Sequence, residues 1–207
     1  MRREERSGWG RHRSLTCQVV EPETEAETAA ALARGPVIAR GLGRAYGDSA
    51  LGSGLTLDLR RWNRMLAFDG TAGQLTAEAG VALGDIVETF LPRGWFPAVT
   101  PGTRHVTLGG MLAADVHGKN HHKEGSIRNY VDWIDLLGPD GELRRCSPKR
   151  NAELFRWSLG GMGLTGVILR AALRLKPVES GWIRQKTLAC DGLAEAIEGQ
   201  GVGAIGK

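Results

Sequence analysis

Two segments carry residue types whose spacing could bind a ligand or do chemistry. The first, residues 40–48, reads Arg-Gly-Leu-Gly-Arg-Ala-Tyr-Gly-Asp and follows the apolar residues Val37, Ile38 and Ala39. Glycine reaches backbone dihedrals that are costly for other residues, so such a turn can aim consecutive amide N–H groups at a phosphate. The segment is therefore predicted to hold a phosphate-containing cofactor, with the Arg44 guanidinium adding positive charge.

This loop does not match the G-x-G-x-x-G pattern of dinucleotide-binding parallel folds. That pattern would need glycine at position 46, where this chain has Tyr46. No helix is expected after the loop, because residues 48–54 are turn-rich and lead into a strand-like alternation at residues 55–59. A different nucleotide-binding fold is indicated.

The second segment, residues 117–122, reads His-Gly-Lys-Asn-His-His. Its i, i+4 histidines, His117 and His121, could share a metal ion if they stood on one helix. Gly118 and Asn120 disfavour a helix, however, and no cysteine or carboxylate completes a ligand set. We expect no metal here. The segment is either a turn with structural histidines or a place where His117 and Lys119 contact a ligand.

Composition limits the class of protein. The chain has 207 residues, 30 glycines and a formal net charge of +4, which fit a globular protein of one large or two small domains. Acidic residues interleave with most basic ones, and the basic run at residues 144–150 contains no aromatic residue for base stacking. Binding to nucleic acid is not expected.

The three cysteines, Cys17, Cys146 and Cys190, show no metal-type spacing and fit reduced thiols in the cytosol. The charged N-terminus lacks a secretory signal, and no apolar stretch approaches the length of a membrane helix. A cytoplasmic location follows as the expectation.

Helical and strand-like stretches are mixed along the chain. Helices are predicted at residues 24–34, 81–91, 107–114 and 151–157, with Thr107 as an N-cap. Strands are predicted at residues 37–40, 55–59, 65–68, 74–79, 130–137, 142–146 and 167–175. Residues 1–20 are expected to form a partly ordered N-terminal arm. This mixture indicates an α+β fold.

Four motifs in order resemble one known family. They are the loop at residues 40–48, the segment from Pro101 to Gly110, the histidine-rich segment, and the glycine-rich residues 160–166. Together, over residues 8–177, they resemble the PCMH-type FAD-binding domain of the vanillyl-alcohol-oxidase superfamily. The histidine-rich segment is most similar to that of the decaprenylphosphoryl-ribose oxidase family.

The resemblance implies a PCMH-type domain made of two α+β subdomains with FAD between them. It divides the chain into an arm at residues 1–20, the FAD-binding domain at 21–178 and the start of a truncated substrate domain at 179–207. It also implies a set of cofactor-binding residues, namely Ala39, Arg40, Gly41, Leu42, Gly43, Arg44, Ala45, Tyr46, Gly47, Asp48, Ser49, Gly102, Thr107, Leu108, Gly109, Gly110, Ala114, Asp115, Val116, His117, Val167 and Ile168.

Two departures from the family pattern affect the cofactor. Arg44 stands where many members of the superfamily carry a histidine joined covalently to the flavin, so a noncovalent FAD is expected. Ala45 replaces a serine that is frequent in relatives, which removes one hydroxyl. The resemblance further places His117 and Lys119 near the reacting edge of the flavin, as the candidate catalytic residues. Tyr46 either packs on the cofactor or is a buried tyrosine bonded to backbone.

Two functions remain open at this stage. One is an FAD-dependent oxidoreductase that oxidises a sugar alcohol, such as a polyprenyl-phosphate-linked pentose, by hydride transfer to flavin N5, with a quinone or another electron acceptor. Peripheral contact with a membrane would suit a lipid-linked substrate. The other is a non-catalytic flavin-binding fragment, since the resembled family continues for roughly as many residues again. A partner would then supply the missing substrate domain.

Overall fold

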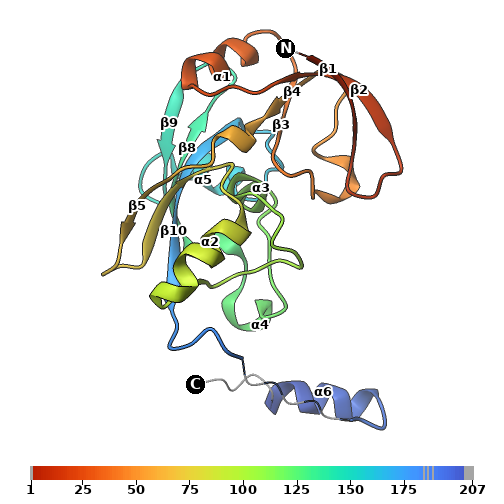
Figure 1. Ribbon diagram of the computed structural model, residues 1–207, viewed down its shortest axis with the longest axis vertical. Helices are drawn as coiled ribbons and strands as arrows, with labels where there is room; N and C mark the ends of the chain where they lie inside the picture. Colours follow the sequence, from red (N-terminus) through yellow and green to blue (C-terminus); the bar gives the residue numbers. More distant parts are fainter. Residues whose placement is uncertain (1, 184, 186, 188, 203–207) are drawn as a thin grey trace.

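Two β-sheets form the framework of the chain (Figure 1). The computed structural model describes residues 2–183, 185, 187 and 189–202. The first sheet has the strand order β1-β2-β4-β3, and the second has the order β5-β6-β10-β8-β9, with β7 paired to β10. Helices and mixed sheets together confirm the predicted α+β class.

The first sheet combines a hairpin with a parallel crossover. Strands β1 (Arg2–Ser7) and β2 (Ser14–Val20) pair antiparallel, whereas β3 (Val37–Arg40) and β4 (Leu55–Asp58) run parallel to each other, and β4 also runs parallel to β2. Helix α1 (Glu25–Leu32) connects β2 to β3, and the Thr24 hydroxyl caps it by accepting from the Glu27 amide. The 3₁₀ turns η1 (Tyr46–Asp48) and η2 (Leu59–Arg61) flank β4.

The expectation that residues 1–20 form a partly ordered arm is wrong for residues 2–20. They form β1 and β2, and β2 lies inside the first sheet between β1 and β4. The charged run Arg2-Arg3-Glu4-Glu5-Arg6 forms most of β1, and an edge strand tolerates charge on its open side. The pairing of Gln18 with Leu55 is non-local and leaves no local sequence signal.

The second sheet is built around one long strand. Strand β10 (Val167–Pro177) pairs antiparallel with β6 (Gln74–Glu78), β8 (Val131–Leu137) and β7 (Trp95–Pro97). Strands β5 (Met65–Asp69) and β9 (Leu143–Cys146) extend it at its two sides. The strands predicted at residues 130–137 and 142–146 are present as β8 and β9, which pair antiparallel, so this sequence prediction is confirmed.

Helices α2 (Leu83–Phe90) and α3 (Leu108–Ala113) cover the second sheet with their apolar residues. Ile86 and Phe90 of α2 and Met111 and Leu112 of α3 lie in one buried core with residues of β6, β8 and β10. Helix α3 is short, since Gly109 and Gly110 weaken it. The Thr107 cap predicted from the sequence is present.

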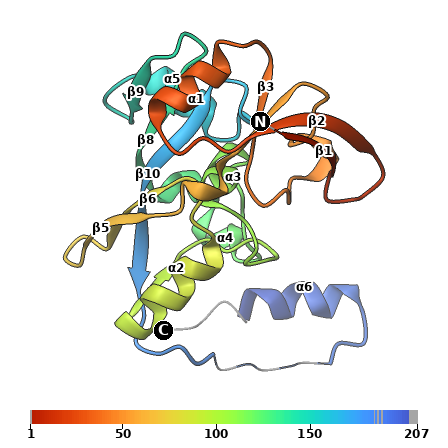
Figure 2. The ribbon, with the colours of Figure 1, turned by 45° about the horizontal axis from the view of Figure 1, so that its top comes forward.

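The remaining elements are short helices and turns. They are η3 (Leu91–Arg93), α4 (His121–Glu124), η4 (Ile127–Tyr130), α5 (Ala152–Ser158) and α6 (Leu193–Val202). Helix α6 lies apart from both sheets in the two ribbon views (Figure 2). Parts of the expected 179–207 region, residues 184, 186, 188 and 203–207, lie outside the described residues.

A second buried core joins the two sheets. Leu57, Leu59 and Trp62 from the first-sheet side pack with Val167 and Leu169 of β10. Because β10 also belongs to the first core, one strand couples both subdomains. The cleft described next opens where these two halves meet.

Candidate FAD-binding site

The glycine loop that follows β3 is held in shape by Arg40. The buried Arg40 guanidinium donates to the carbonyls of Ser7 and Ala50, both at 2.8 Å. Burial lowers the pKa of Arg40 from its usual value, and the nearby Arg6 charge lowers it further. A Cβ atom at Gly43 would lie 2.4 Å from Arg40 Nη2, and Gly43 has a positive φ of 67°. The loop therefore folds tightly over this side chain, which only glycine permits here.

The loop meets α3 at a glycine–threonine contact. A Cβ atom at Gly41 would lie 2.2 Å from the Thr107 hydroxyl oxygen. That same oxygen accepts from the Gly110 amide and caps α3. At this point the Gly41 backbone of one subdomain lies against the Thr107 side chain of the other, beside the N-terminus of α3. Gly109 packs against Ala79, where an added Cβ would come within 2.8 Å of the Ala79 Cβ.

The second glycine-rich loop closes the other end of the cleft. The amides of Gly160 and Met162 donate to the carbonyls of Leu112 and Ala113, at 3.0 and 2.8 Å, so the loop rests on the C-terminal end of α3. Met162 has a left-handed φ of 51°, which is uncommon for a residue with a side chain, and half of it is exposed. Its side chain reaches the cleft from the loop.

Two adjoining cavities mark the deepest part of this cleft. The larger has a volume of about 120 Å³ and the smaller about 70 Å³. Both are lined by Ala39 and Gly41 on one side and by Thr107, Gly110 and Ala113 on the other, with Met162 at the loop. The cleft therefore lies between the two subdomains, with glycine backbone on its walls and apolar side chains at its base.

Most of the residues predicted to bind the cofactor line these cavities. Those lining one or both cavities are Ala39, Arg40, Gly41, Leu42, Gly43, Arg44, Ala45, Ser49, Thr107, Gly109, Gly110, Ala114, Val116 and Ile168. Those lining neither are Tyr46, Gly47, Asp48, Gly102, Leu108, Asp115, His117 and Val167, and the candidate catalytic residue Lys119 also lines neither. Apart from Ile168 of β10, the first set comes from β3 and the loop after it, or from α3 and the residues that flank it.

The residues outside the cavities have other surroundings. Tyr46 is 81% exposed, so the alternative of a buried tyrosine is wrong. Leu108 and Val167 are buried in the two cores, and Gly102 lines a separate cavity beside α2. The Asp115 carboxylate bonds the Arg128 guanidinium at 2.5 Å.

His117 and Lys119 are exposed and follow Val116, which lines the larger cavity. The His117 ring meets the His121 ring edge-on at 5.3 Å, and α4 begins only at His121. The two histidines therefore do not share a helical face. Within the described ranges, no group of three His, Cys, Asp or Glu side chains is arranged to hold a metal ion.

Helix α4 is anchored at its C-terminal end by a three-residue cluster. The Glu124 carboxylate accepts from the Tyr130 hydroxyl and from Lys176 Nζ, the latter at 3.1 Å. The bond from Tyr130 and the Lys176 charge hold the pKa of Glu124 below its usual range, and the same bond raises the pKa of Tyr130 to about 12. The histidine-rich segment is thereby fixed to the end of β10.

Several lining residues were not predicted from the sequence. Ala50, Val106, Met111, Ala113 and Met162 line the larger cavity, and Leu59, Ala79, Ser158, Gly163, Thr165 and Gly166 line the smaller. The run of glycines at residues 160–166 was a usable signal for Met162 and Gly163. The others are mostly apolar or small residues that lie far apart along the chain and come together only in the folded cleft.

Comparison with known proteins identifies the family. The family model for the FAD binding domain matches residues 17–147. The chain belongs to this FAD-binding family, whose domain is of the PCMH type. FAD is therefore its cofactor. The cleft fits that cofactor, because its lining combines the glycine residues Gly41 and Gly43 and the cationic Arg44 with apolar side chains such as Val106.

Its relatives in the family are oxidases and dehydrogenases. The chain is 43% identical over 183 residues to decaprenylphosphoryl-beta-D-ribose oxidase of Mycolicibacterium smegmatis, covering 84% of this chain and 40% of that protein. It is 31% identical to cytokinin dehydrogenase 9 of Oryza sativa, covering 72% of this chain and 29% of the dehydrogenase. It is 30% identical to L-gulonolactone oxidase of Bos taurus, covering 66% and 31%.

The chain thus spans 40% or less of the length of these relatives. Among the helices of the described ranges, none combines the length and apolar character needed to cross a membrane. The basic run predicted not to bind nucleic acid is partly neutralised, since Arg144 pairs with Asp140 and Arg145 with Asp135.

Proposed function

We propose that this chain is the FAD-binding module of an oxidoreductase that oxidises a CH–OH group of a sugar alcohol, of the polyprenyl-phosphate-linked pentose type. The observation that carries the proposal is the cleft itself, where the loop at Gly41 faces the capped N-terminus of α3 at Thr107. Similarity to a decaprenylphosphoryl-ribose oxidase over 84% of the chain supports the substrate class.

The glycine loop would hold the negatively charged part of FAD. Arg44 lines the larger cavity and uses one guanidinium nitrogen on the Leu42 carbonyl, so its other donors remain available for the pyrophosphate. The apolar residues Val106, Met111 and Val116 would contact the uncharged ring system. FAD is larger than either cavity, so much of it would extend along the loop.

Bound FAD supplies an acceptor, at N5, for the hydride that leaves the carbinol carbon. The chain's own residues would position that carbon and exclude water. His117 and Lys119, next to Val116, are proposed to hydrogen-bond the substrate hydroxyl or the flavin edge. The Lys119 ammonium would also stabilise negative charge on the reduced ring.

The proposal includes noncovalent attachment, because Arg44 offers no nucleophile to the flavin. It also includes a cytoplasmic location, a quinone or another electron acceptor, and peripheral contact with a membrane. The domain division at residues 1–20, 21–178 and 179–207 belongs to it as well, with the arm replaced by the β1–β2 hairpin.

A second candidate is a non-catalytic FAD-binding protein that needs a substrate domain from a partner. Large apolar side chains are exposed beyond β10, including Trp182 and Ile183, which are 92% and 91% exposed. Exposed apolar groups of this kind suit an interface with another domain. This candidate shares the FAD site and differs only in turnover.

The proposal is tested by the visible spectrum of the purified 207-residue chain. We expect FAD absorbance that returns after reconstitution of the apoprotein, and flavin that stays in the supernatant after acid precipitation. Anaerobic addition of phosphorylated pentose alcohols then separates the candidates: bleaching supports the oxidoreductase, and a yellow protein that no sugar reduces supports the non-catalytic one. A chain that does not bind FAD contradicts both.

Arg44→Glu tests the role of the loop. We expect the Kd for FAD to rise by about tenfold or more, because a charge-assisted hydrogen bond contributes about 1.5–3 kcal/mol and the variant adds repulsion. Arg156→Glu, on the exposed face of α5, is the matched control and should leave the Kd unchanged. An Arg44→Glu variant with wild-type affinity would mean that the pyrophosphate lies elsewhere.

A further inference from the structure

The turn between β1 and β2 touches the glycine loop at three successive residues. The Ser7 carbonyl accepts from Arg40 at 2.8 Å, Gly8 faces Asp48, and the Trp9 ring lies under the Arg44 guanidinium at 4.9 Å. In both ribbon views this hairpin lies beside the orange segment that follows β3 (Figures 1 and 2). Residues 7–9 precede the segment matched by the family model, which begins at residue 17.

The contact at Gly8 leaves no room for a side chain. A Cβ atom there would lie 1.8 Å from the Asp48 Oδ1 atom. Asp48 itself has a left-handed φ of 59°, and the Leu51 amide donates to its carbonyl. The end of the glycine loop therefore packs closely on the turn, and a side chain at position 8 requires the Asp48 carboxylate to move.

The contact at Trp9 orients Arg44. The Arg44 side chain is exposed, and an exposed arginine normally samples many rotamers. Here its guanidinium is held between the Leu42 carbonyl, at 2.9 Å, and the Trp9 ring face. Stacking on a ring does not use the in-plane N–H donors, so those that do not bond Leu42 can donate to an anionic oxygen.

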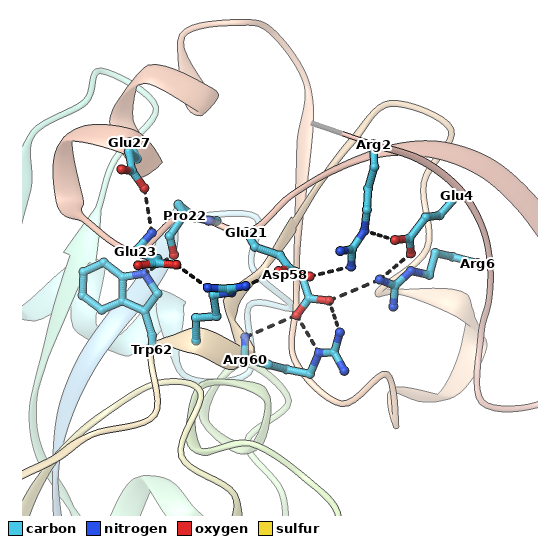
Figure 3. A network of polar contacts seen from close by, with 11 residues as sticks. Arg2, Glu4, Arg6, Glu21, Pro22, Glu23, Glu27, Asp58, Arg60 and Trp62 are labelled. Carbon is cyan, nitrogen blue, oxygen red and sulfur yellow. Dashed lines mark hydrogen bonds and ion pairs between the residues drawn. The ribbon is translucent and has the colours of Figure 1, made fainter.

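The hairpin itself is fixed to the first sheet by an ion-pair network (Figure 3). Arg6 lies one residue before the turn, and its guanidinium pairs with Glu4 at 2.6 Å and with the buried Asp58 at 3.3 Å. Asp58 ends β4, the central strand next to β3. The turn is thus rigidly placed relative to the loop that it touches.

We propose that residues Ser7, Gly8 and Trp9 form a clamp that pre-organises the glycine loop for FAD, with Trp9 as a positioning residue acting through Arg44. The proposal rests on FAD binding in this cleft. Without the clamp, Arg44 would have to be ordered at the moment of binding, and the affinity would fall by that entropic cost.

The test measures the Kd for FAD by flavin fluorescence, together with the thermal unfolding midpoint of each apoprotein. Trp9→Leu should raise the Kd about two- to fivefold, the size expected for an exposed cation–π contact. Trp9→Phe should restore most of the affinity, because it keeps a ring face. Trp182→Leu, which changes a tryptophan that is 92% exposed, is the matched control and should have no effect.

A double-mutant cycle separates positioning from general destabilisation. If Trp9 acts through Arg44, Trp9→Leu should not raise the Kd further when Arg44→Gln is already present. Equal effects of Trp9→Leu in both backgrounds would overturn the assignment. So would an unchanged Kd in both Trp9→Leu and Gly8→Ala, provided that the wild-type chain binds FAD.

A readout without FAD keeps the clamp distinct from the proposed function. Trypsin should cut the apoprotein after Arg44 faster in Gly8→Ala than in the wild type, as followed by mass spectrometry, because the Asp48 carboxylate is displaced and its contact with the turn is lost. If the wild-type chain fails to bind FAD, the proposed function falls while this cleavage rate still decides whether residues 7–9 hold the loop. An unchanged rate in Gly8→Ala overturns the clamp.

Discussion

Single side chains at the cleft divide into those that shape it and those left to bind. Arg40 was predicted to bind the cofactor because it belongs to the glycine loop, yet its guanidinium is spent on the carbonyls of Ser7 and Ala50. Arg44, four residues later, donates to one backbone carbonyl, that of Leu42, and its other guanidinium N–H groups make no bond to the backbone of the described residues. Loop membership cannot separate these two arginines, since the difference comes from partners far away along the chain.

Gly41 is the residue on which the approach of the two subdomains depends most. Gly41→Ala would place a methyl group 2.2 Å from the Thr107 hydroxyl oxygen, so either the cap of α3 or the loop must move. We expect the free energy of unfolding to fall by about 1–3 kcal/mol, the usual cost of overpacking, and FAD affinity to fall with it. Thermal unfolding and flavin fluorescence titration measure the two effects.

Gly192→Ala is the control for this prediction, because an added Cβ there meets no atom within 4 Å. If Gly41→Ala had the same unfolding free energy and the same FAD affinity as Gly192→Ala, the Thr107 side chain would be able to rotate away from the added methyl group at no cost in free energy. The contact would then be a crowded surface of the cleft and not a determinant of its shape.

At the scale of elements, the sequence predicted the features that depend on neighbouring residues and did not predict those that depend on pairing between distant segments. The Thr107 cap and the neighbouring strands β8 and β9 could be predicted because each depends on nearby residues in the chain. Strands β1 and β2 were missed because β2 pairs with β4 across an intervening helix and strand. The contacts of residues 7–9 with the glycine loop are non-local in the same way.

The attachment of the β1–β2 hairpin depends on the charge of Asp58. This carboxylate is 1% exposed and accepts two bonds from the Arg60 guanidinium, at 2.7 and 2.6 Å, and one from the Arg60 amide at 3.3 Å. Burial acts to raise the pKa of Asp58, but the bonds from Arg60 outweigh it, so the pKa lies below its usual value. A depressed pKa contributes stability that is present above the unfolded-state value, about 3.9, and is lost as the pH falls through the folded one.

We therefore expect thermal unfolding midpoints of the wild type to drop below about pH 4, partly because Asp58 becomes protonated. Asp58→Asn should lower the free energy of unfolding at pH 7 by about 1–3 kcal/mol, less than for a fully buried pair because Arg60 is half exposed. The difference from wild type should shrink toward pH 2.

Asp140→Asn provides a paired but exposed aspartate as the comparison. Bonds from Arg144 lower the pKa of Asp140 to about 2, yet solvent screens this pair and its loss should leave stability at pH 7 almost unchanged. If Asp58→Asn were equally neutral across the pH range, the hairpin would not be held by this network.

At the scale of the whole molecule, the cleft exists because two cores share one strand. The family resemblance predicted two subdomains with the cofactor between them, and the two sheets agree with it. It did not predict that β10 packs its residues into both cores. That feature depends on the path of the whole chain. It means that the two walls of the cleft are connected by packing against the same strand, β10.

Leu169 is the side chain that tests this continuity, because it is fully buried in the core joining the sheets while its strand pairs with β6 and β8. Leu169→Ala should lower the free energy of unfolding by about 2–5 kcal/mol, whereas Leu66→Ala, at a position 42% exposed on β5, should have little effect. In Leu169→Ala, far-UV circular dichroism should report the same unfolding midpoint as tryptophan fluorescence. Trp62 in the shared core contributes to that fluorescence. Two separate transitions in Leu169→Ala, with the second sheet surviving the loss of the shared core, would instead mean that the subdomains fold independently and that FAD binding, not β10, holds the cleft together.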